Sequence, residues 1–205
     1  MKRLAKAPGF SLIEMLVVVA IIGIIAAISV PVAGSISRGT KLTRATQTIV
    51  DQLAIARQIA IGRNHTVEVR FYQFADPEIP GSKFAFRALQ SVEMVNAHVA
   101  APLDKVQSLP ESTIIDAAPV LSSVVDPAKR TLSTGVDSLP RVGTSYKYVA
   151  LRFRPDGSTD LLPTAGSWFL TLHDETSGDG LTQPPANFST IEIDPVNGAL
   201  KFFRP

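Results

Sequence analysis

The chain has 205 residues, no cysteine and a formal net charge of +2, from 20 Lys and Arg against 18 Asp and Glu. This length allows one domain of ordinary size plus an additional segment. So small a net charge does not by itself indicate a nucleic-acid partner. The lack of cysteine excludes disulfides, thiolate catalysis and cysteine-ligated metal sites.

The N-terminal part of the sequence is a short basic segment, residues 1–9, followed by an apolar one, residues 10–36. Residues 1–9 carry three cations and no acid, so the positive-inside rule predicts a cytoplasmic N-terminus. About 20 apolar residues suffice for a helix to cross a bilayer, and we expect residues 10–36 to form such a helix. Glu14 is its single charged residue. A carboxylate facing lipid costs about 2.5–3.5 kcal/mol, so Glu14 should have a partner.

The sequence GFSLIE, from Gly9 to Glu14, resembles the prepilin signature of type IV pilins and type II secretion pseudopilins. The resemblance implies that residues 1–9 are a leader, which a prepilin peptidase removes by cutting after Gly9. It further implies that Phe10 becomes the N-methylated new terminus. Glu14 would stay within the membrane and pair with the α-amino group of Phe10 on a neighbouring subunit during assembly.

Two other interpretations of this segment remain open. Small residues at Ala26, Ala27 and Ser29 could form the cleavage site of an ordinary secretory signal. The segment could also be a plain membrane anchor in which Glu14 is accidental. Pro31 stands where pilin helices often bend, and we expect a kink there because proline removes a backbone donor and clashes with the preceding turn.

Residues 37–62 continue without a break and change from apolar to amphipathic. Apolar side chains recur at helical spacing, with polar ones on the opposite face. This pattern predicts a helix that packs one face on a soluble domain and ends near Gly62. A core helix unrelated to any filament would show the same pattern. The expected buried positions are Leu42, Ile49, Leu53, Ala56 and Ala60, and the expected exposed ones are Arg44, Gln47, Asp51 and Gln58.

Residues 63–205 are expected to form a β-rich globular head. Short stretches of alternating apolar and polar residues are separated by turns rich in Pro, Gly, Asn and Asp. With the long N-terminal helix they predict an α+β fold, in which a transmembrane half and an amphipathic half of the helix precede an antiparallel sheet. The expected strands are 66–72, 83–92, 146–153, 168–172, 190–193 and 199–203.

A variable insertion is expected near residues 94–145, where prolines and serines interrupt short apolar stretches. A structureless loop of this length would be unusual in a compact domain, so we expect one or two short strands or helical turns. The head also resembles that of the H-type minor pseudopilins. This second resemblance rests on the passage from Ala56 to Phe71, the turn from Phe153 to Gly157, and the closing pattern from Ile191 to Leu200. It implies a pilin fold in which the insertion lies on the exposed face and carries partner specificity.

No catalytic constellation is recognisable, so we expect a protein that is not an enzyme and needs no cofactor. Nucleophile elbow, phosphate loop and zinc motifs are absent from the sequence, and its three histidines lack metal-ligand spacing. One weak metal candidate is the acidic turn of Asp174, Glu175 and Asp179, whose carboxylates could bind calcium. The competing interpretation is an ordinary solvated turn.

Two other functions are compatible with parts of the sequence. One is a DNA-binding minor pilin, because Lys201 and Arg204 flank Phe202 and Phe203, and basic residues among aromatic ones can bind nucleic acid. In that case Arg152 and Arg154 are expected to lie nearby. Scattered cations more often belong to an ordinary solvated strand, so we do not expect nucleic acid as a partner. The other is a membrane-anchored periplasmic binding domain.

The sequence as a whole favours a structural subunit of a type II secretion or type IV pilus-like filament. The expected partners are a prepilin peptidase, other pilin or pseudopilin subunits and the inner membrane. The subunit would cross that membrane once, with its N-terminus cytoplasmic and its head periplasmic, before it enters an extracytoplasmic filament. The sequence distinguishes neither between the two machines and DNA uptake nor between an abundant and a tip subunit.

Overall fold

The computed structural model describes residues 10–78, 80–95, 100–135 and 138–205, without the side chains of residues 26–36 and of Ala100. The chain forms two compact units, Met1–Gly39 and Thr40–Pro205. One long helix, α1 (Leu12–Arg63), contributes to both units. The second unit contains all the strands, which pair exclusively in antiparallel fashion among the described residues. This arrangement confirms the α+β class.

In the second unit, α1 forms the centre of the hydrophobic core. All five apolar positions expected to be buried, from Leu42 to Ala60, are at most 2% exposed, and they pack in one cluster with side chains of the sheet. The four polar positions on the opposite face are exposed, as expected. The helix ends at Arg63, and the next residue, Asn64, has a φ of 55°. A left-handed residue here is a common way to end a helix, and asparagine tolerates it better than most side chains.

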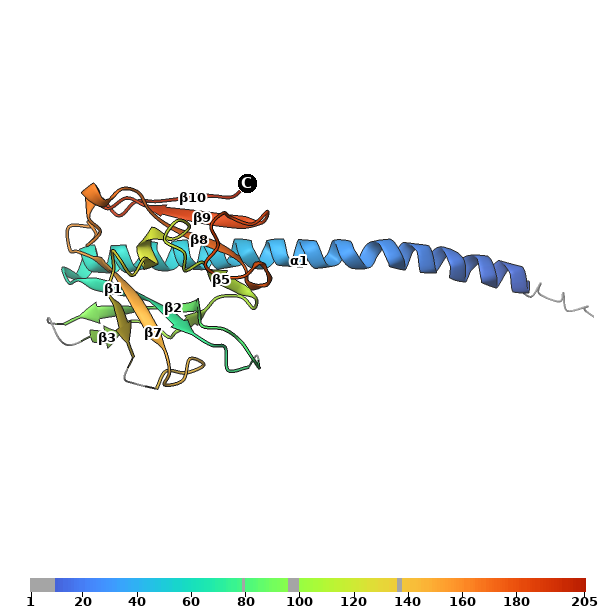
Figure 1. Ribbon diagram of the computed structural model, residues 1–205, viewed down its shortest axis with the longest axis horizontal. Coiled ribbons are helices and arrows are strands. Elements are labelled where there is room, and N and C mark those ends of the chain that lie inside the picture. The colour runs from blue at the N-terminus through green and yellow to red at the C-terminus, as the bar shows by residue number, and fades with distance from the viewer. Residues whose placement is uncertain (1–9, 79, 96–99, 136–137) are drawn as a thin grey trace, which may run out of the picture. The chain divides into compact units, whose positions relative to one another are not determined.

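The strands form one sheet in the order β10-β9-β8-β5-β2-β1-β7-β6, with β3 and β4 also pairing with β2. The two halves, β8–β10 and β1, β2 and β7, lie on either side of the helix in Figure 1. Six of the strands are those that alternation predicts. The strands are β1 (Val67–Phe74), β2 (Ala85–Met94), β3 (Ala100–Pro102), β4 (Gln107–Ser108), β5 (Thr113–Ile115), β6 (Leu132–Thr134), β7 (Lys147–Phe153), β8 (Trp168–Asp174), β9 (Phe188–Ile193) and β10 (Leu200–Phe203), and the 3-10 turns are η1 (Ser123–Val125), η2 (Pro163–Ala165) and η3 (Glu175–Ser177).

Strand β1 is buried on both faces, although its alternation predicts a half-buried strand. Val69 and Phe71 join the core cluster with α1. On the other face Tyr72 and Phe74 pack in a second cluster with Val142 and neighbouring residues of the segment before β7. That segment lies within 94–145, so part of the expected insertion covers the outer face of the sheet.

The region 94–145 also supplies part of the sheet itself. It contains β3, β4, β5, η1 and β6, more elements than the sequence predicts. Strand β5 lies between β2 and β8, where Ile115 pairs with both Phe86 and Leu172. Ile114, Ile115 and Val124 of this region are fully buried. The expectation that this region decorates the exposed face is therefore wrong for β5 and η1.

Two turns at the ends of strands meet against α1. In the turn after β7, Gly157 has a φ of 82°, and its carbonyl oxygen accepts a hydrogen bond from Arg57 Nε at 3.2 Å. In the turn before β10, Gly198 has a φ of 67°. A Cβ atom at Gly198 would lie 2.8 Å from the carbonyl oxygen of Gly157. Only glycine at position 198 allows this close approach.

Candidate assembly site

The first turn of α1 is held by a reciprocal pair of side-chain contacts. Ser11 Oγ accepts a hydrogen bond from the backbone N–H of Glu14 at 3.2 Å. Glu14 Oε2 in turn accepts one from the backbone N–H of Ser11 at 3.3 Å. This is the capping-box arrangement of a serine followed three residues later by a glutamate. Glu14 is also an acidic residue in the first turn of the helix, a position where acidic side chains commonly stabilise helices.

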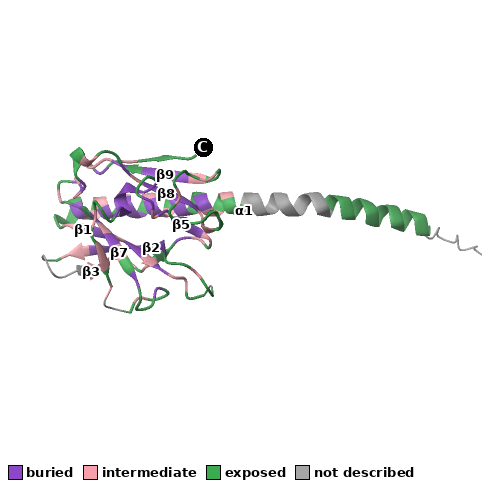
Figure 2. Cartoon of the chain, in the orientation of Figure 1, coloured by how far each residue is buried: buried purple, intermediate pink, exposed green. Residues whose placement is uncertain are grey.

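The helix behind this turn exposes a continuous apolar surface. Every residue from Phe10 to Ile25 is exposed, as the green part of α1 in Figure 2 shows. Phe10 is 80% exposed. Soluble proteins rarely expose so large an apolar surface unless it contacts another protein or a membrane. In the described part of the chain, no helix combines the length and the hydropathy that a membrane crossing requires.

Several of the expected site residues lie at or before the first described residue, Phe10. Phe10 and Glu14 stand together at the start of the helix. Gly9, the expected cleavage position, lies outside the described residues, as does the whole leader. The helix is continuous through Pro31, but that side chain is outside the described set, so the kink stays a prediction.

Comparison with known proteins bears on this N-terminal segment. Residues 4–30 match the family described as the prokaryotic N-terminal methylation motif. This chain carries a prepilin-type methylation motif. The match includes Gly9, Phe10 and Glu14, and confirms the resemblance for that part of the sequence. No curated protein matches the chain. Among solved structures, the minor pseudopilin EpsH from the type 2 secretion system of Vibrio cholerae is similar at 12% identity, over 80% of this chain and 98% of that one, with a TM-score of 0.45.

Away from the methylation motif, the carboxylates of Asp174 and Asp179 accept hydrogen bonds from groups of the same chain. Asp174 Oδ1 accepts hydrogen bonds from the backbone N–H and the hydroxyl of Thr176 at 2.9 and 2.6 Å. Asp179 Oδ1 accepts from the N–H of Ala117 and that of Gly180, both at 2.8 Å. Among the residues described, no group of three acidic or histidine side chains is arranged to hold a metal ion. The structure therefore does not bring the calcium candidates together.

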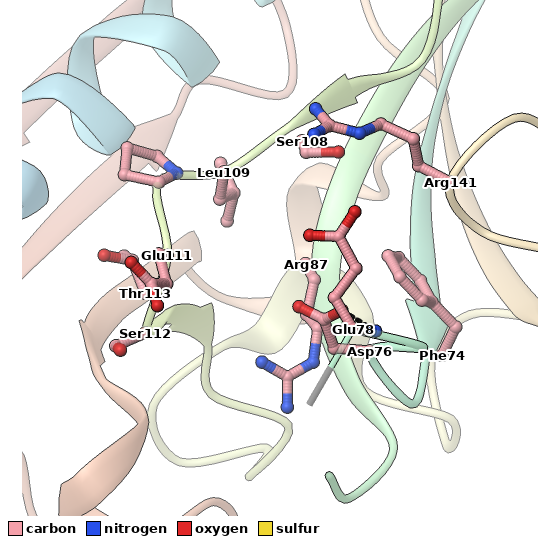
Figure 3. Close-up of a pocket in the computed structure, with 11 residues that line it drawn as sticks. Phe74, Asp76, Glu78, Arg87, Ser108, Leu109, Glu111, Ser112, Thr113 and Arg141 are labelled. Carbon is pink, nitrogen blue, oxygen red and sulfur yellow. Dashed lines mark hydrogen bonds between the residues drawn. The ribbon is translucent and has the colours of Figure 1, made fainter. Parts of the chain in front are cut away.

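The third acid of that turn, Glu175, binds a buried arginine. Arg87 Nη1 and Nη2 donate to the two carboxylate oxygens of Glu175 at 2.7 and 2.5 Å. These hydrogen bonds hold the pKa of Glu175 below its usual value. Arg87 is 6% exposed and lines a cavity of about 400 Å³, together with Asp76, Glu78 and other residues (Figure 3). The sequence does not predict this pair, because no local pattern links β2 to η3.

His173, near the end of β8, is also structural. His173 Nε2 lies 2.8 Å from Asp116 Oδ2, and both side chains are fully buried. His173 Nδ1 lies 2.9 Å from the backbone oxygen of Asp174. The second oxygen of Asp116, Oδ1, accepts from the N–H of Ala118 at 2.7 Å. This pair joins β8 to the segment after β5, away from solvent.

The basic residues proposed for nucleic-acid binding do not form one free surface. Arg204 donates to the hydroxyl of Thr43 and, at 3.5 Å, to Asn187 Oδ1. Arg152 Nε donates to Glu68 at 2.8 Å, and Arg154 Nη1 donates to the backbone oxygen of Thr159 at 2.8 Å. Strands β7 and β10 also lie near opposite ends of the sheet order. Lys201 is exposed beside Phe202 and Phe203, on the strand at the other end of the sheet order from Arg152.

Proposed function

We propose that this chain is a pilin-like structural subunit that assembles into a filament of a type II secretion or type IV pilus-like machine. The observation that carries this proposal is the exposed apolar segment from Phe10 to Ile25, which includes the start of α1 and lies within the methylation motif. An apolar surface of this kind is stable only when it is buried away from water. Lipid buries it before assembly, and the corresponding helices of neighbouring subunits bury it afterwards.

Burial of the apolar helix is favourable in both locations. Burial of apolar surface stabilises by about 25 cal/mol per Å² removed from water, whether lipid or protein covers it. The transfer from membrane to filament therefore exchanges one apolar environment for another. The anchor would comprise residues 10–36, of which 26–36 have no described side chains. It would place the N-terminus in the cytoplasm and the head in the periplasm.

Processing and assembly would depend on three positions in the motif. A prepilin peptidase would cut after Gly9, and Phe10 would become the methylated terminus. Glu14 would then pair with the α-amino group of Phe10 on a neighbouring subunit. Opposite charges attract strongly where water competes poorly, so this pair would set the register between helices. The proposed role requires neither a cofactor nor a catalytic residue.

The experiment that tests this function measures processing in cells. The chain is expressed with an active prepilin peptidase, extracted from the membrane, and analysed by intact mass and N-terminal sequencing. We expect a mature chain that begins at Phe10 and carries one methyl group. A Gly9→Leu variant serves as the control and should keep its leader. A mature chain that begins near Ser29 would instead identify an ordinary secretory signal and would overturn the proposal.

Assembly is tested on the same cells by shearing filaments and by crosslinking. We expect processed chain in the sheared fraction, or crosslinked to other subunits. A processed chain that always remains a monomer in the membrane, although its partner subunits are present, would contradict the assembly role.

A further inference from the structure

The head contains a basic groove on the β7 side of the sheet, separate from the methylation motif. Its volume is about 450 Å³. Four cations and two acids line it, with a few hydroxyl groups and apolar atoms between them. The charged residues of the basic groove are Arg70, Lys129, Arg130, Arg152, Glu68 and Asp160.

A buried carboxylate fixes two of these cations in place. Glu68 is 2% exposed, although it carries a charge. Its Oε1 accepts from Arg70 Nε at 2.6 Å, and its Oε2 accepts from Arg152 Nε at 2.8 Å. The guanidinium of Arg70 also lies over the ring of Tyr148, 4.8 Å from its centroid. Two guanidinium groups are thus held by their Nε atoms. The Arg70 side chain also interacts with the Tyr72 hydroxyl, whereas the terminal nitrogens of Arg152 donate to no protein acceptor among the described residues.

The charges in the groove do not balance. Arg130 pairs with Asp160 at 2.9 Å, which accounts for one cation and one acid. Lys129 Nζ has no carboxylate partner in the described residues; it donates to the backbone oxygen of Ala165 at 3.2 Å. The groove therefore has a formal surplus of two positive charges. Burial lowers the pKa of Arg70, but the hydrogen bond and the charge of Glu68, together with Tyr148 and Tyr72, leave that pKa raised, so the guanidinium stays charged.

We propose that the basic groove binds the carboxylate side chains of an acidic peptide segment from a partner protein. Guanidinium groups held in a fixed orientation bind carboxylates through paired hydrogen bonds, which are stronger and more specific than those of a mobile lysine. This interaction is independent of the proposed assembly through α1. It would give the head a binding specificity of its own.

Two observations favour a peptide over a nucleic acid. Nucleic acids are bound by neutralising many successive phosphates, whereas the surplus here is two charges confined to one groove. In addition, β6 is the last strand of the sheet order, and its outer edge pairs with no other described strand. Ser133 of β6 and Thr131, the residue before β6, line the groove. An extended peptide can pair with such an edge while its side chains enter the adjacent pocket.

The test uses the full chain in a non-ionic detergent and a dye-labelled oligoglutamate peptide. Binding is followed by fluorescence anisotropy, with oligoglutamine as the uncharged probe. We expect saturable binding of oligoglutamate alone, weakened at least about tenfold when ionic strength rises from about 0.05 M to about 0.5 M. Trp168 is the single tryptophan of the chain, and its ring lies 5.4 Å from Lys129 Nζ. Its intrinsic emission should therefore change with the same titration midpoint.

Three variants locate the binding. We expect Arg152→Gln to weaken it about tenfold, because a charged donor to the ligand is lost. Lys129→Gln should weaken it as well; Lys129 is exposed, so this variant keeps the test valid if Arg152→Gln folds poorly. Lys105→Gln, an exposed cation outside the groove, should bind like the parent. Unchanged affinity in both groove variants, equal binding of oligoglutamine, or tighter binding of single-stranded DNA would each overturn the proposal.

Discussion

Ser11 and Glu14 cap the first turn of α1 for each other, each accepting a hydrogen bond from the other's backbone N–H. The glutamate of the methylation motif thus has a partner within its own chain before any neighbouring subunit arrives. Capping uses the shape and the oxygen of the side chain, whereas pairing with a neighbouring α-amino group would use its charge. The two roles can be separated by substitution.

The first prediction compares Glu14→Gln with Glu14→Ala. Glutamine retains the capping box without the charge, and alanine removes both. We expect both variants to be inserted and processed, because the span loses a charge and the cleavage position is unchanged. Both should fail to assemble, since the pairing requires the carboxylate. The measurement compares processed chain in the membrane with chain in the sheared filament fraction.

The matched control is Ser11→Ala, which keeps the charge and removes one half of the cap. Loss of a capping side chain costs about 1 kcal/mol of helix stability, which neighbouring apolar turns can tolerate. This variant should still assemble. If Glu14→Gln assembled like the parent while Ser11→Ala did not, capping would be the function of the pair.

The second prediction concerns the head alone. Thr40–Pro205 forms a compact unit with its own hydrophobic core. A truncated chain that begins at Thr40 should therefore be soluble and monomeric, with a circular-dichroism spectrum that shows both helix and strand. Persistent aggregation of this truncated chain, or a spectrum without strand content, would contradict the division into units.

The third prediction compares two neighbouring positions of α1 in that truncated chain. Leu53 is fully buried in the core, and Ile55 is 50% exposed. We expect Leu53→Ala to lower the free energy of unfolding by about 2–5 kcal/mol, because it leaves a cavity between helix and sheet. Ile55→Ala should cost less than about 1 kcal/mol. Urea unfolding followed by circular dichroism measures both, and equal losses would mean that the helix packs with another face.

The fourth prediction concerns acid sensitivity. The pKa of Glu175 is lowered from its ordinary value of 4.5 by Arg87. A carboxyl group with a lowered folded-state pKa stabilises the protein above its unfolded-state pKa, and this stabilisation is lost as the pH falls through the folded-state value. Glu175→Gln should therefore cost about 1 kcal/mol at neutral pH, a moderate value because water reaches the 29% of the side chain that is exposed.

The difference between parent and Glu175→Gln should decrease as the pH falls below about 4.5. Urea unfolding at several pH values gives this profile. Glu78→Gln is a suitable control, because Glu78 is exposed and lines the same cavity as Arg87. A loss of stability that did not depend on pH would mean that the pair acts through packing.

The fifth prediction concerns the contact between the two turns at α1. Gly198→Ala introduces a methyl group 2.8 Å from the carbonyl oxygen of Gly157 and also strains a positive φ. Gly81→Ala strains a similar φ, but its methyl group has no neighbour within 4 Å. We expect Gly81→Ala to cost about 1–2 kcal/mol and Gly198→Ala clearly more. Equal thermal midpoints would show that the turns separate easily.

Much of this fold follows from local sequence patterns. Helical spacing from Leu42 to Ala60 and alternation in the six long strands are repeated over enough residues to be read directly. The capping box could also have been predicted, because a serine three residues before a glutamate at the start of an apolar run is its usual signature.

The remainder depends on contacts between distant residues. Strand β5 has three residues, too few to show a period, and its place in the sheet comes from pairing with both β2 and β8. Arg87 and Glu175 are 88 residues apart, and neither has a neighbour in sequence that indicates the other. The basic groove likewise combines residues from β1, β7 and the segment before β6. Each of these features appears only once the chain has folded.

Strand β5 would determine how the head responds to tension. It is the one strand in the path of the sheet between β8 and β2, with three residue pairs on the β8 side and one on the β2 side. Strands β1 and β2, by contrast, share eight pairs. Tension that pulls the C-terminal strands away from β1 and β2 would be concentrated on the few hydrogen bonds of β5. The pairing of β5 with its neighbours would break first, while β1 and β2 stayed paired.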